Sequence, residues 1–212
     1  MILNEYTLMF LGLQGGDLKK RLYKVDGKSI QTPLSWVERL KICIEAAGML
    51  DYLHTEKRVK NRIIHRDVKS SNILLDGNMA AKVSDLGLLT RKSDVYSFGV
   101  VLLEILCGRH VVDPSLRDEE LRLVGWAQWN IKEGTLNDII DLNMTGLTPC
   151  SRMKIQIVPD CLKAFLNIVV KCLQTQPKDR PTMREVVVDL EAALAVQERG
   201  EYLVHSRYNN GE

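Results

Sequence analysis

The stretch from Asp94 to Gly108 constrains the fold of this chain most, because as a helix it is apolar on nearly all sides. Its apolar residues are Val95, Phe98, Val100, Val101, Leu102, Leu103, Ile105 and Leu106. A helix that is hydrophobic all round lies in the middle of a domain. We therefore expect a mainly α-helical domain with this helix at its centre and Asp94 as its first residue.

Two capping boxes predict the starts of two further helices. In Ser35–Glu38 and in Thr182–Glu185 a hydroxyl residue is followed three positions later by Glu, so each side chain can accept from the other's backbone N–H. The first box predicts a helix as far as about His54. Spacings of three and four predict the buried faces of these two helices: Trp36, Leu40, Cys43, Ala47 and Leu50 in the first, and Val186, Leu190 and Ala193 in the second.

Weaker patterns predict the remaining elements. Residues 17–23 are expected to form a short helix with Asp17 as its N-cap, and residues 135–141 a single turn of helix. Residues 143–158 show no steady period and predict a loop, after which Asp160 would cap a helix to Cys172. Residues 198–212 form a polar tail, expected to fray after Gly200. A helix over 119–133 would turn one stripe inward: Leu121, Val124, Gln128 and Ile131.

Length, charge and cysteine usage limit the class of protein. The 212 residues suffice for one domain with a sizeable core, and the net charge of +2 gives no electrostatic case for nucleic acid. The basic run Lys57–Arg62 is most simply a solvated loop. None of the five cysteines forms a C-x-x-C pair, which favours reduced core thiols over disulfides or a zinc site. No signal peptide and no apolar segment of bilayer length occurs, so we expect a cytoplasmic chain without a transmembrane segment.

Residues 65–72, His-Arg-Asp-Val-Lys-Ser-Ser-Asn, carry the clearest chemistry. Asp67 is a carboxylate that can take a proton from an incoming hydroxyl, and Lys69 can neutralise a phosphoryl oxygen. Asn72 and, further on, Asp85 offer oxygen ligands that suit magnesium rather than zinc. Phosphoryl transfer depends on positioning and charge neutralisation, so a base, a cation and two magnesium ligands predict that reaction.

A β-hairpin is predicted to bring these residues together. Residues 73–75 predict a strand, Asp76–Asn78 a tight turn, and residues 80–83 a second strand. The hairpin would fold Asp85 back beside Asn72.

Residues 65–72 resemble the catalytic loop of eukaryotic protein kinases, and Asp85-Leu86-Gly87 resembles their magnesium motif with Leu in place of Phe. Lys69, two positions after the Asp, is similar to the serine/threonine branch. Residues 92–100 resemble a helix of plant receptor-like kinases, and residues 177–183 resemble the end of the same lobe.

The resemblance covers about residues 1–197 and implies a partial protein kinase domain, the hinge and the large C-terminal lobe. That lobe belongs to the α+β class, here a helical bundle with a small β-hairpin at the catalytic loop. The polar tail 198–212 would lie outside the domain.

Roles for individual residues also follow from the resemblance. Asp67 would be the catalytic base and Lys69 the phosphate clamp, while Asn72 and Asp85 would hold the Mg of Mg-ATP. The backbone near Glu5 and Thr7 would meet adenine, with Leu74 as its floor; an untethered N-terminal tail is the alternative for that segment. The residues implied as structural support are His65, Arg66, Asp94 and Arg180.

Asp94 in this family holds the backbone of the catalytic loop by hydrogen bonds, and a plain N-cap is the alternative for it. Both roles are compatible.

Two parts of a complete kinase are not found. The chain begins at the hinge, and Gly87-Leu88 leads directly into Leu89-Thr90, as though roughly 20–30 residues with the activation segment had been excised. Arg66 would then lack a phosphate, and Arg180 would lack the Glu it pairs with in the family. Leaving a buried Arg180 unpaired would cost about 3–5 kcal/mol, unless it turns to solvent.

Three hypotheses for function follow. By family the chain is a serine/threonine protein kinase domain that uses ATP and Mg to phosphorylate a protein substrate, impaired or inactive in this truncated form. The second is an inactive lobe that binds a protein partner through exposed apolar surface. The third is an incomplete gene product. Full-length relatives in this family would be plasma-membrane proteins with the kinase facing the cytosol.

Overall fold

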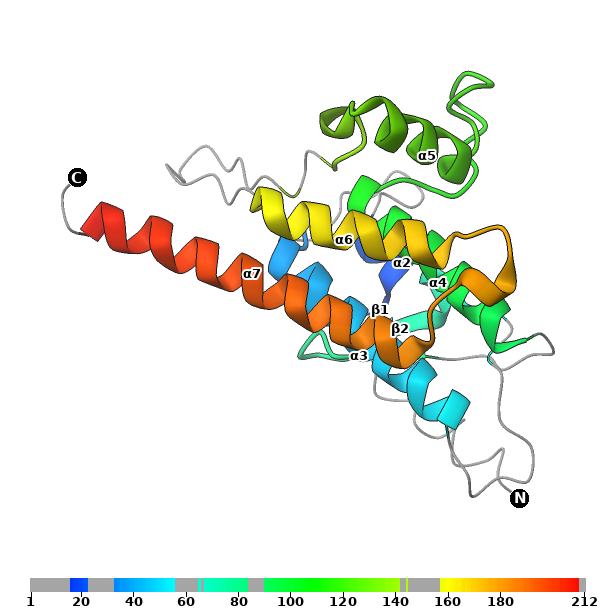
Figure 1. Cartoon of the computed structure of the whole chain (residues 1–212), viewed down its shortest axis with the longest axis horizontal. Coiled ribbons are helices and arrows are strands. Elements are labelled where there is room, and N and C mark those ends of the chain that lie inside the picture. Colours follow the sequence, from blue (N-terminus) through cyan, green and yellow to red (C-terminus); the bar gives the residue numbers. More distant parts are fainter. Residues whose placement is uncertain are drawn as a thin grey trace.

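The computed structural model is a bundle of helices around one central helix, α4 (Arg91–Cys107) (Figure 1). It describes residues 16–22, 33–55, 65, 67–83, 90–141, 144 and 157–209, with side chains as far as residue 202. The mainly helical fold predicted from the sequence is confirmed. The other helices are α2 (Leu18–Leu22), α3 (Trp36–Thr55), α5 (Leu123–Glu133), α6 (Pro159–Cys172) and α7 (Met183–Asn209), with 3₁₀ turns at Ser70–Asn72, Leu136–Asp138 and Pro177–Asp179.

A small antiparallel sheet lies beside the bundle, with strand order β1–β2–β3. Its strands are β1 (Gly16–Asp17), β2 (Ile73–Leu75) and β3 (Ala81–Val83). Ile73 pairs with Val83, and Leu75 pairs with both Ala81 and Gly16. The hairpin predicted from the sequence is therefore confirmed over β2 and β3.

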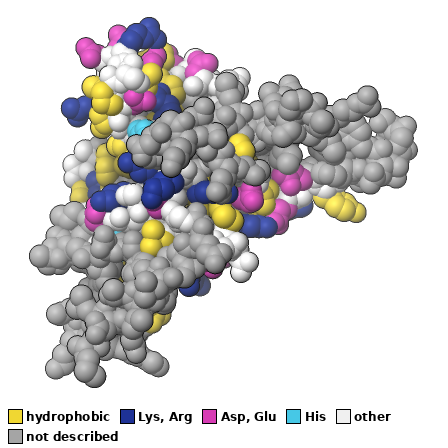
Figure 2. Space-filling model, turned by 180° about the vertical axis from the view of Figure 1, so that it is seen from behind, with side chains coloured by type: hydrophobic (Ala, Val, Ile, Leu, Met, Phe, Trp, Pro, Cys, Tyr) yellow, Lys and Arg dark blue, Asp and Glu magenta, His cyan; other side chains and the backbone are white. Residues whose placement is uncertain are grey.

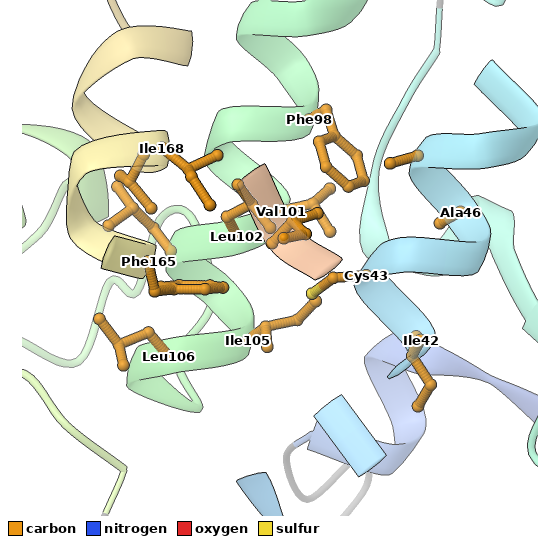
Figure 3. Close-up of a cluster of buried hydrophobic side chains, with 14 of the residues drawn as sticks. Ile42, Cys43, Ala46, Phe98, Val101, Leu102, Ile105, Leu106, Phe165 and Ile168 are labelled. Carbon is orange, nitrogen blue, oxygen red and sulfur yellow. The ribbon is translucent and has the colours of Figure 1, made fainter. Parts of the chain in front are cut away.

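The core forms where α4 packs against α3 and α6. Figure 3 shows the α4 side chains Val101 and Leu102 lying between Phe165 of α6 and Cys43 of α3, and all four residues are at most 1% exposed. At Gly99 an added Cβ would lie 2.8 Å from the Cβ of Cys172, so α4 and α6 approach closely there. The central buried helix expected from the sequence is confirmed.

The start of α4 differs from the expectation. The helix begins at Arg91, and its N-cap is Thr90, whose Oγ1 accepts from Ser93 N at 3.2 Å. Asp94 is therefore not the N-cap; it lies inside the first turn, which leaves its carboxylate available for contacts elsewhere in the domain.

Both capping boxes are present. Ser35 N donates to Glu38 Oε2 at 2.8 Å, and Glu38 N donates back to Ser35 Oγ at 3.3 Å. Thr182 N donates to Glu185 Oε2 at 2.7 Å, with the return bond at 3.3 Å. The inner faces predicted for α3 and α7 are buried, with every predicted residue at most 1% exposed.

Thr182→Ala is expected to lower the free energy of unfolding by about 1 kcal/mol, because it removes the acceptor for the N–H of Glu185 at the start of α7. Urea unfolding followed by circular dichroism measures the change. Thr175→Ala is the matched control, since Thr175 is exposed and contributes only its carbonyl to the contacts of Arg180. An equal loss in both variants would contradict a capping role.

The predictions for α5 and α6 are wrong in detail. α5 begins at Leu123 rather than 119, because Arg122 forms an isolated bridge with Val112. Of the predicted inner stripe, Val124 and Ile131 are partly buried against the core, whereas Gln128 is exposed. The N-cap of α6 is Val158, so Asp160 lies within the first turn and does not cap the helix. The buried residues of α5 are Leu123, Ala127 and Asn130.

α7 continues to Asn209, where the sequence predicted fraying after Gly200. Figure 1 shows it as the longest helix, and its C-terminal part extends beyond the start of α6. Val158 N donates to Gln197 Oε1 at 2.9 Å, and a Cβ added at Gly200 would lie 2.4 Å from Val158 Cγ2. The start of α6 therefore packs closely against α7 at Gln197 and Gly200, as far as the predicted boundary.

Four cysteines, Cys43, Cys107, Cys161 and Cys172, are buried free thiols, as expected. Burial raises the pKa of Cys107 and of Cys172 to about 12 each, so both stay protonated and inert at neutral pH. Cys150 lies outside the described residues. Within the described ranges, no helix has the length and apolar character needed to cross a membrane.

The surface carries both signs of charge. In Figure 2, Lys and Arg side chains form a row across the middle of the face opposite that of Figure 1, with Asp and Glu side chains beside them. This mixture agrees with the nearly balanced net charge of +2.

Candidate active site

Three of the predicted site residues meet at the carboxylate of Asp67. Its Oδ2 accepts from Lys69 Nζ at 2.5 Å and from Asn72 Nδ2 at 2.9 Å. Asn72 Nδ2 also donates to the backbone carbonyl of Asp67 at 2.8 Å. The side chains of Asp67 and Lys69 are half exposed, so the carboxylate is both held and accessible. The ammonium group of Lys69 and the amide of Asn72 therefore both bind a carboxylate that remains accessible to solvent.

The pKa of Asp67 lies below its ordinary value of 3.8. The hydrogen bond from Lys69 lowers it most, and the hydrogen bond from Asn72 lowers it further, while partial burial opposes both. Because the folded-state pKa is the lower one, the stabilisation from this pairing is present above the unfolded-state pKa. It is lost as the pH falls through the folded-state pKa. At neutral pH Asp67 is an ionised carboxylate that can accept a proton.

Lys69→Met is expected to raise the pKa of Asp67, because the variant removes the largest cause of its depression. Carbon-13 NMR titration of the carboxyl group measures the change. Lys82→Met is the control, since Lys82 lies on β3 and makes no ion pair within the described part of the chain. An unchanged titration curve in Lys69→Met would contradict the assigned contact.

A 3₁₀ turn over Ser70–Asn72 sets the direction of the asparagine. Asn72 N donates to the carbonyl of Lys69 at 2.9 Å, and β2 starts at the next residue, Ile73. Asn72 is 7% exposed, and its amide nitrogen is used by Asp67. The carbonyl oxygen is therefore the atom of this side chain with the chemistry of a magnesium ligand. The side-chain carbonyl oxygen of Asn72 and the neighbouring carboxylate of Asp67 are oxygen donors of the kind that a hard cation prefers.

Asp94 connects the central helix to the beginning of the loop. Its Oδ2 accepts from His65 N at 2.9 Å and lies 2.8 Å from His54 Nε2 at the end of α3. Asp94 and His65 are at most 1% exposed, and His65 Nδ1 accepts from Asp67 N at 3.3 Å. This is the backbone contact that the resemblance implied for Asp94. The role of His54 as a second partner of Asp94 was not predicted from the sequence.

Arg180 is neither unpaired in the core nor turned wholly to solvent. It is half buried, and its guanidinium donates to the carbonyls of Gln174 at 2.7 Å, Lys92 at 2.8 Å and Thr175 at 3.2 Å. It also lies over the ring of Tyr96, 4.7 Å from the centroid. Among the residues that the structure describes, no carboxylate pairs with it. Peptide carbonyls bind Arg180 instead of the glutamate that the resemblance implied to be missing.

Lys92 reciprocates this contact. Its Nζ donates to the carbonyl of Arg180 and, at 3.2 Å, to that of Pro181. Each cation therefore binds the backbone of the other residue, an arrangement that we call the Arg180–Lys92 clasp. The clasp attaches the start of α4 to the segment that precedes α7.

The remaining candidates are placed only in part. Leu74 lies in β2, half buried and opposite Asp17 and Lys82. The other four candidates lie outside the described residues: Glu5, Thr7, Arg66 and Asp85.

Comparison with known proteins identifies the family. The family model described as "Protein tyrosine and serine/threonine kinase" matches residues 2–92 and 88–190. Receptor-like protein kinase ANXUR2 of Arabidopsis thaliana is 41% identical over 239 residues, covering 98% of this chain and 26% of that protein. Receptor-like protein kinase FERONIA, from the same plant, is 39% identical over 229 residues, covering 93% of this chain and 24% of that protein.

The matches cover nearly all of this chain but only part of each relative. The chain spans about a quarter of the length of the relatives that it matches. The ANXUR2 alignment is about 30 positions longer than the part of this chain that it covers, 98% of 212 residues. The two family segments meet at residues 88–92, where the sequence predicts an excision. The chain belongs to the protein tyrosine and serine/threonine kinase family and matches its receptor-like members.

Proposed function

We propose that this chain carries the large lobe of a serine/threonine protein kinase, which transfers a phosphoryl group from Mg-ATP to a hydroxyl of a protein substrate. One observation carries the proposal: the Asp67 carboxylate is within hydrogen-bonding distance of both Lys69 and Asn72. The position of Lys69, two residues after Asp67, supports the serine/threonine branch. The similarity to receptor-like kinases supports a lobe on the cytosolic side of a membrane.

Each residue has a role that its chemistry allows. Asp67, ionised at neutral pH, accepts the proton of the substrate hydroxyl. Lys69 would neutralise an oxygen of the transferred group, and Asn72 would hold magnesium together with Asp85. Mg-ATP, when bound, supplies the phosphoryl group and offsets its charge. The backbone near Glu5 and Thr7, with Leu74 beneath, would hold the adenine.

A second candidate function is an inactive lobe that binds a protein partner. It is favoured by the two family segments that meet at residues 88–92 and by the roughly 30 positions of ANXUR2 without a counterpart. A short connection there would weaken substrate docking, so we propose that transfer by this chain is slow compared with a complete kinase domain.

Unfolding with and without Mg-ATP decides between the two functions. At a hundred times the dissociation constant, nucleotide is expected to raise the free energy of unfolding by about 2.7 kcal/mol. Asn72→Ala and excess EDTA should each abolish the rise, because both remove magnesium coordination. Asn78→Ala, in the exposed β2–β3 turn, should keep it. No rise for the unaltered chain at millimolar Mg-ATP would overturn the kinase proposal and leave the binding lobe.

A further inference from the structure

Glu104 is a buried carboxylate inside the apolar central helix, and none of the roles described so far uses it. It is 4% exposed, and its Oε1 accepts from the hydroxyl of Ser70 at 3.0 Å. Ser70 is 2% exposed. Taking a carboxylate out of water carries a large free-energy penalty, which an apolar residue at this position would avoid. The carboxylate must therefore be explained by what it holds.

Ser70 lies where its position affects the candidate active site directly. It is the first residue of the 3₁₀ turn, between Lys69 and Asn72, and the N–H of Asn72 closes the turn on the carbonyl of Lys69 at 2.9 Å. A side-chain bond at Ser70 consequently fixes the residues on both sides of it. These are the two residues whose side chains donate to Asp67.

The same helix also holds the other end of the loop. Asp94 accepts from the backbone N–H of His65, and Glu104 follows ten residues later on α4, about 15 Å along the helix axis. One carboxylate thus holds the loop before Asp67 and the other holds it after Lys69. A hydrogen bond is directional, so this second attachment fixes the turn more narrowly than apolar packing would.

We propose that Glu104 is a positioning residue, which acts through the Ser70 hydroxyl to place Lys69 and Asn72 around Asp67. The consequence for catalysis rests on the proposed kinase function, whereas the placement itself does not. Ser71 provides an internal comparison, because it lies in the same turn and its side chain has no hydrogen bond to the described residues.

Amide hydrogen exchange tests the placement whether or not the chain is an active kinase. Ser70→Ala is expected to speed exchange at the Asn72 amide about tenfold, the effect of losing one buried hydrogen bond. Ser71→Ala, the matched control, should leave it within about twofold. Glu104→Gln keeps an oxygen acceptor and should retain most of the protection, while Glu104→Met should lose it. Equal exchange in Ser70→Ala and Ser71→Ala would overturn the proposal.

Double variants test whether Glu104 and Ser70 act through the hydrogen bond between them. If Glu104 acts through Ser70, adding Glu104→Gln or Glu104→Met to Ser70→Ala should change Asn72 exchange by no more than about twofold. If the changes at Ser70 and Glu104 each multiplied the Asn72 exchange rate independently, the proposal would be overturned. Ser70→Ala and Glu104→Gln are small changes, so the comparison remains decisive even where Glu104→Met fails to fold.

Mg-ATP affinity separates positioning from a purely structural role. In folded protein, Ser70→Ala is expected to weaken Mg-ATP binding about tenfold, with Ser71→Ala unchanged and Glu104→Gln near the unaltered chain. If the unaltered chain binds no Mg-ATP, the kinase proposal fails, and the exchange measurement alone decides the placement. If the chain binds Mg-ATP and Ser70→Ala alters neither exchange nor affinity, the positioning inference fails while the kinase proposal stands.

Discussion

Arg39→Met is expected to lower the free energy of unfolding by about 3–5 kcal/mol, a large part of the roughly 5–15 kcal/mol that a domain has. Arg39 is 1% exposed, and its Nη2 donates to Asp141 Oδ2 at 2.6 Å. Methionine would fill much of the same volume but leave the buried carboxylate without its cation. Urea unfolding measures the loss.

The position of Arg39 explains why the expected effect is so large. Besides Asp141, its guanidinium donates to the carbonyl of Leu34 at 3.1 Å and to that of Ile105 at 2.5 Å. It therefore connects the segment before α3, the end of α4 and the segment after α5. Gly108 leaves room for the pair, since a Cβ there would lie 2.5 Å from Asp141 Cγ. Burial lowers the pKa of Arg39, and the charge of Asp141 opposes that shift.

Two further variants make the prediction specific. Lys41→Met removes an exposed ion pair, 3.8 Å from Glu198, and should cost at most about 1 kcal/mol. Adding Asp141→Leu to Arg39→Met should recover part of the loss, because no buried charge then remains unpaired. A loss for Arg39→Met no larger than that for Lys41→Met would contradict the role of the buried pair.

Asp94→Ala is expected to produce the second large effect, a loss of about 2–6 kcal/mol. Two buried groups, the N–H of His65 and the ring of His54, would lose this acceptor at about 1–3 kcal/mol each. Because the first of these contacts holds the start of the loop that carries Asp67, the variant should also lose any stabilisation by Mg-ATP. Urea unfolding with and without Mg-ATP measures both effects.

Milder variants show whether the carboxylate itself matters. Asp94→Asn keeps an oxygen acceptor for His65 and should lose less stability than Asp94→Ala. Asp189→Ala removes an exposed partner of Lys171 at 2.9 Å and should cost at most about 1 kcal/mol. If Asp94→Ala matched Asp189→Ala in stability, the loop would not depend on this attachment.

The sequence predicted the parts of the fold that local contacts determine. Each capping box joins residues three apart, such as Ser35 with Glu38, so pattern and structure agree. The central helix was predictable because an all-apolar stretch has few alternatives to burial. The N-cap of α6 could not be predicted from local sequence, because the N–H of Val158 is satisfied by Gln197, 39 residues away. The inner stripe of α5 was predicted only in part, because the start of this helix depends on a bridge between Arg122 and Val112.

The candidate site likewise combines residues that are close in sequence with supports that come from distant positions. Asp67, Lys69 and Asn72 lie within six residues, so their proximity could be expected from the sequence. The supports for them come from distant positions: Glu104 is 34 residues from Ser70. In the sequence Glu104 only interrupts an apolar run, and no local pattern predicts its hydrogen bond with Ser70. Asp94 was identified through the resemblance, not through periodicity.

The Arg180–Lys92 clasp has a consequence for the conditions that the lobe tolerates. All its acceptors are peptide carbonyls, which carry no net charge and do not titrate. A carboxylate partner would be protonated in acid and screened at high ionic strength. The join between the start of α4 and the segment before α7 is therefore expected to depend less on pH and ionic strength than the ordinary ion pairs on the same surface.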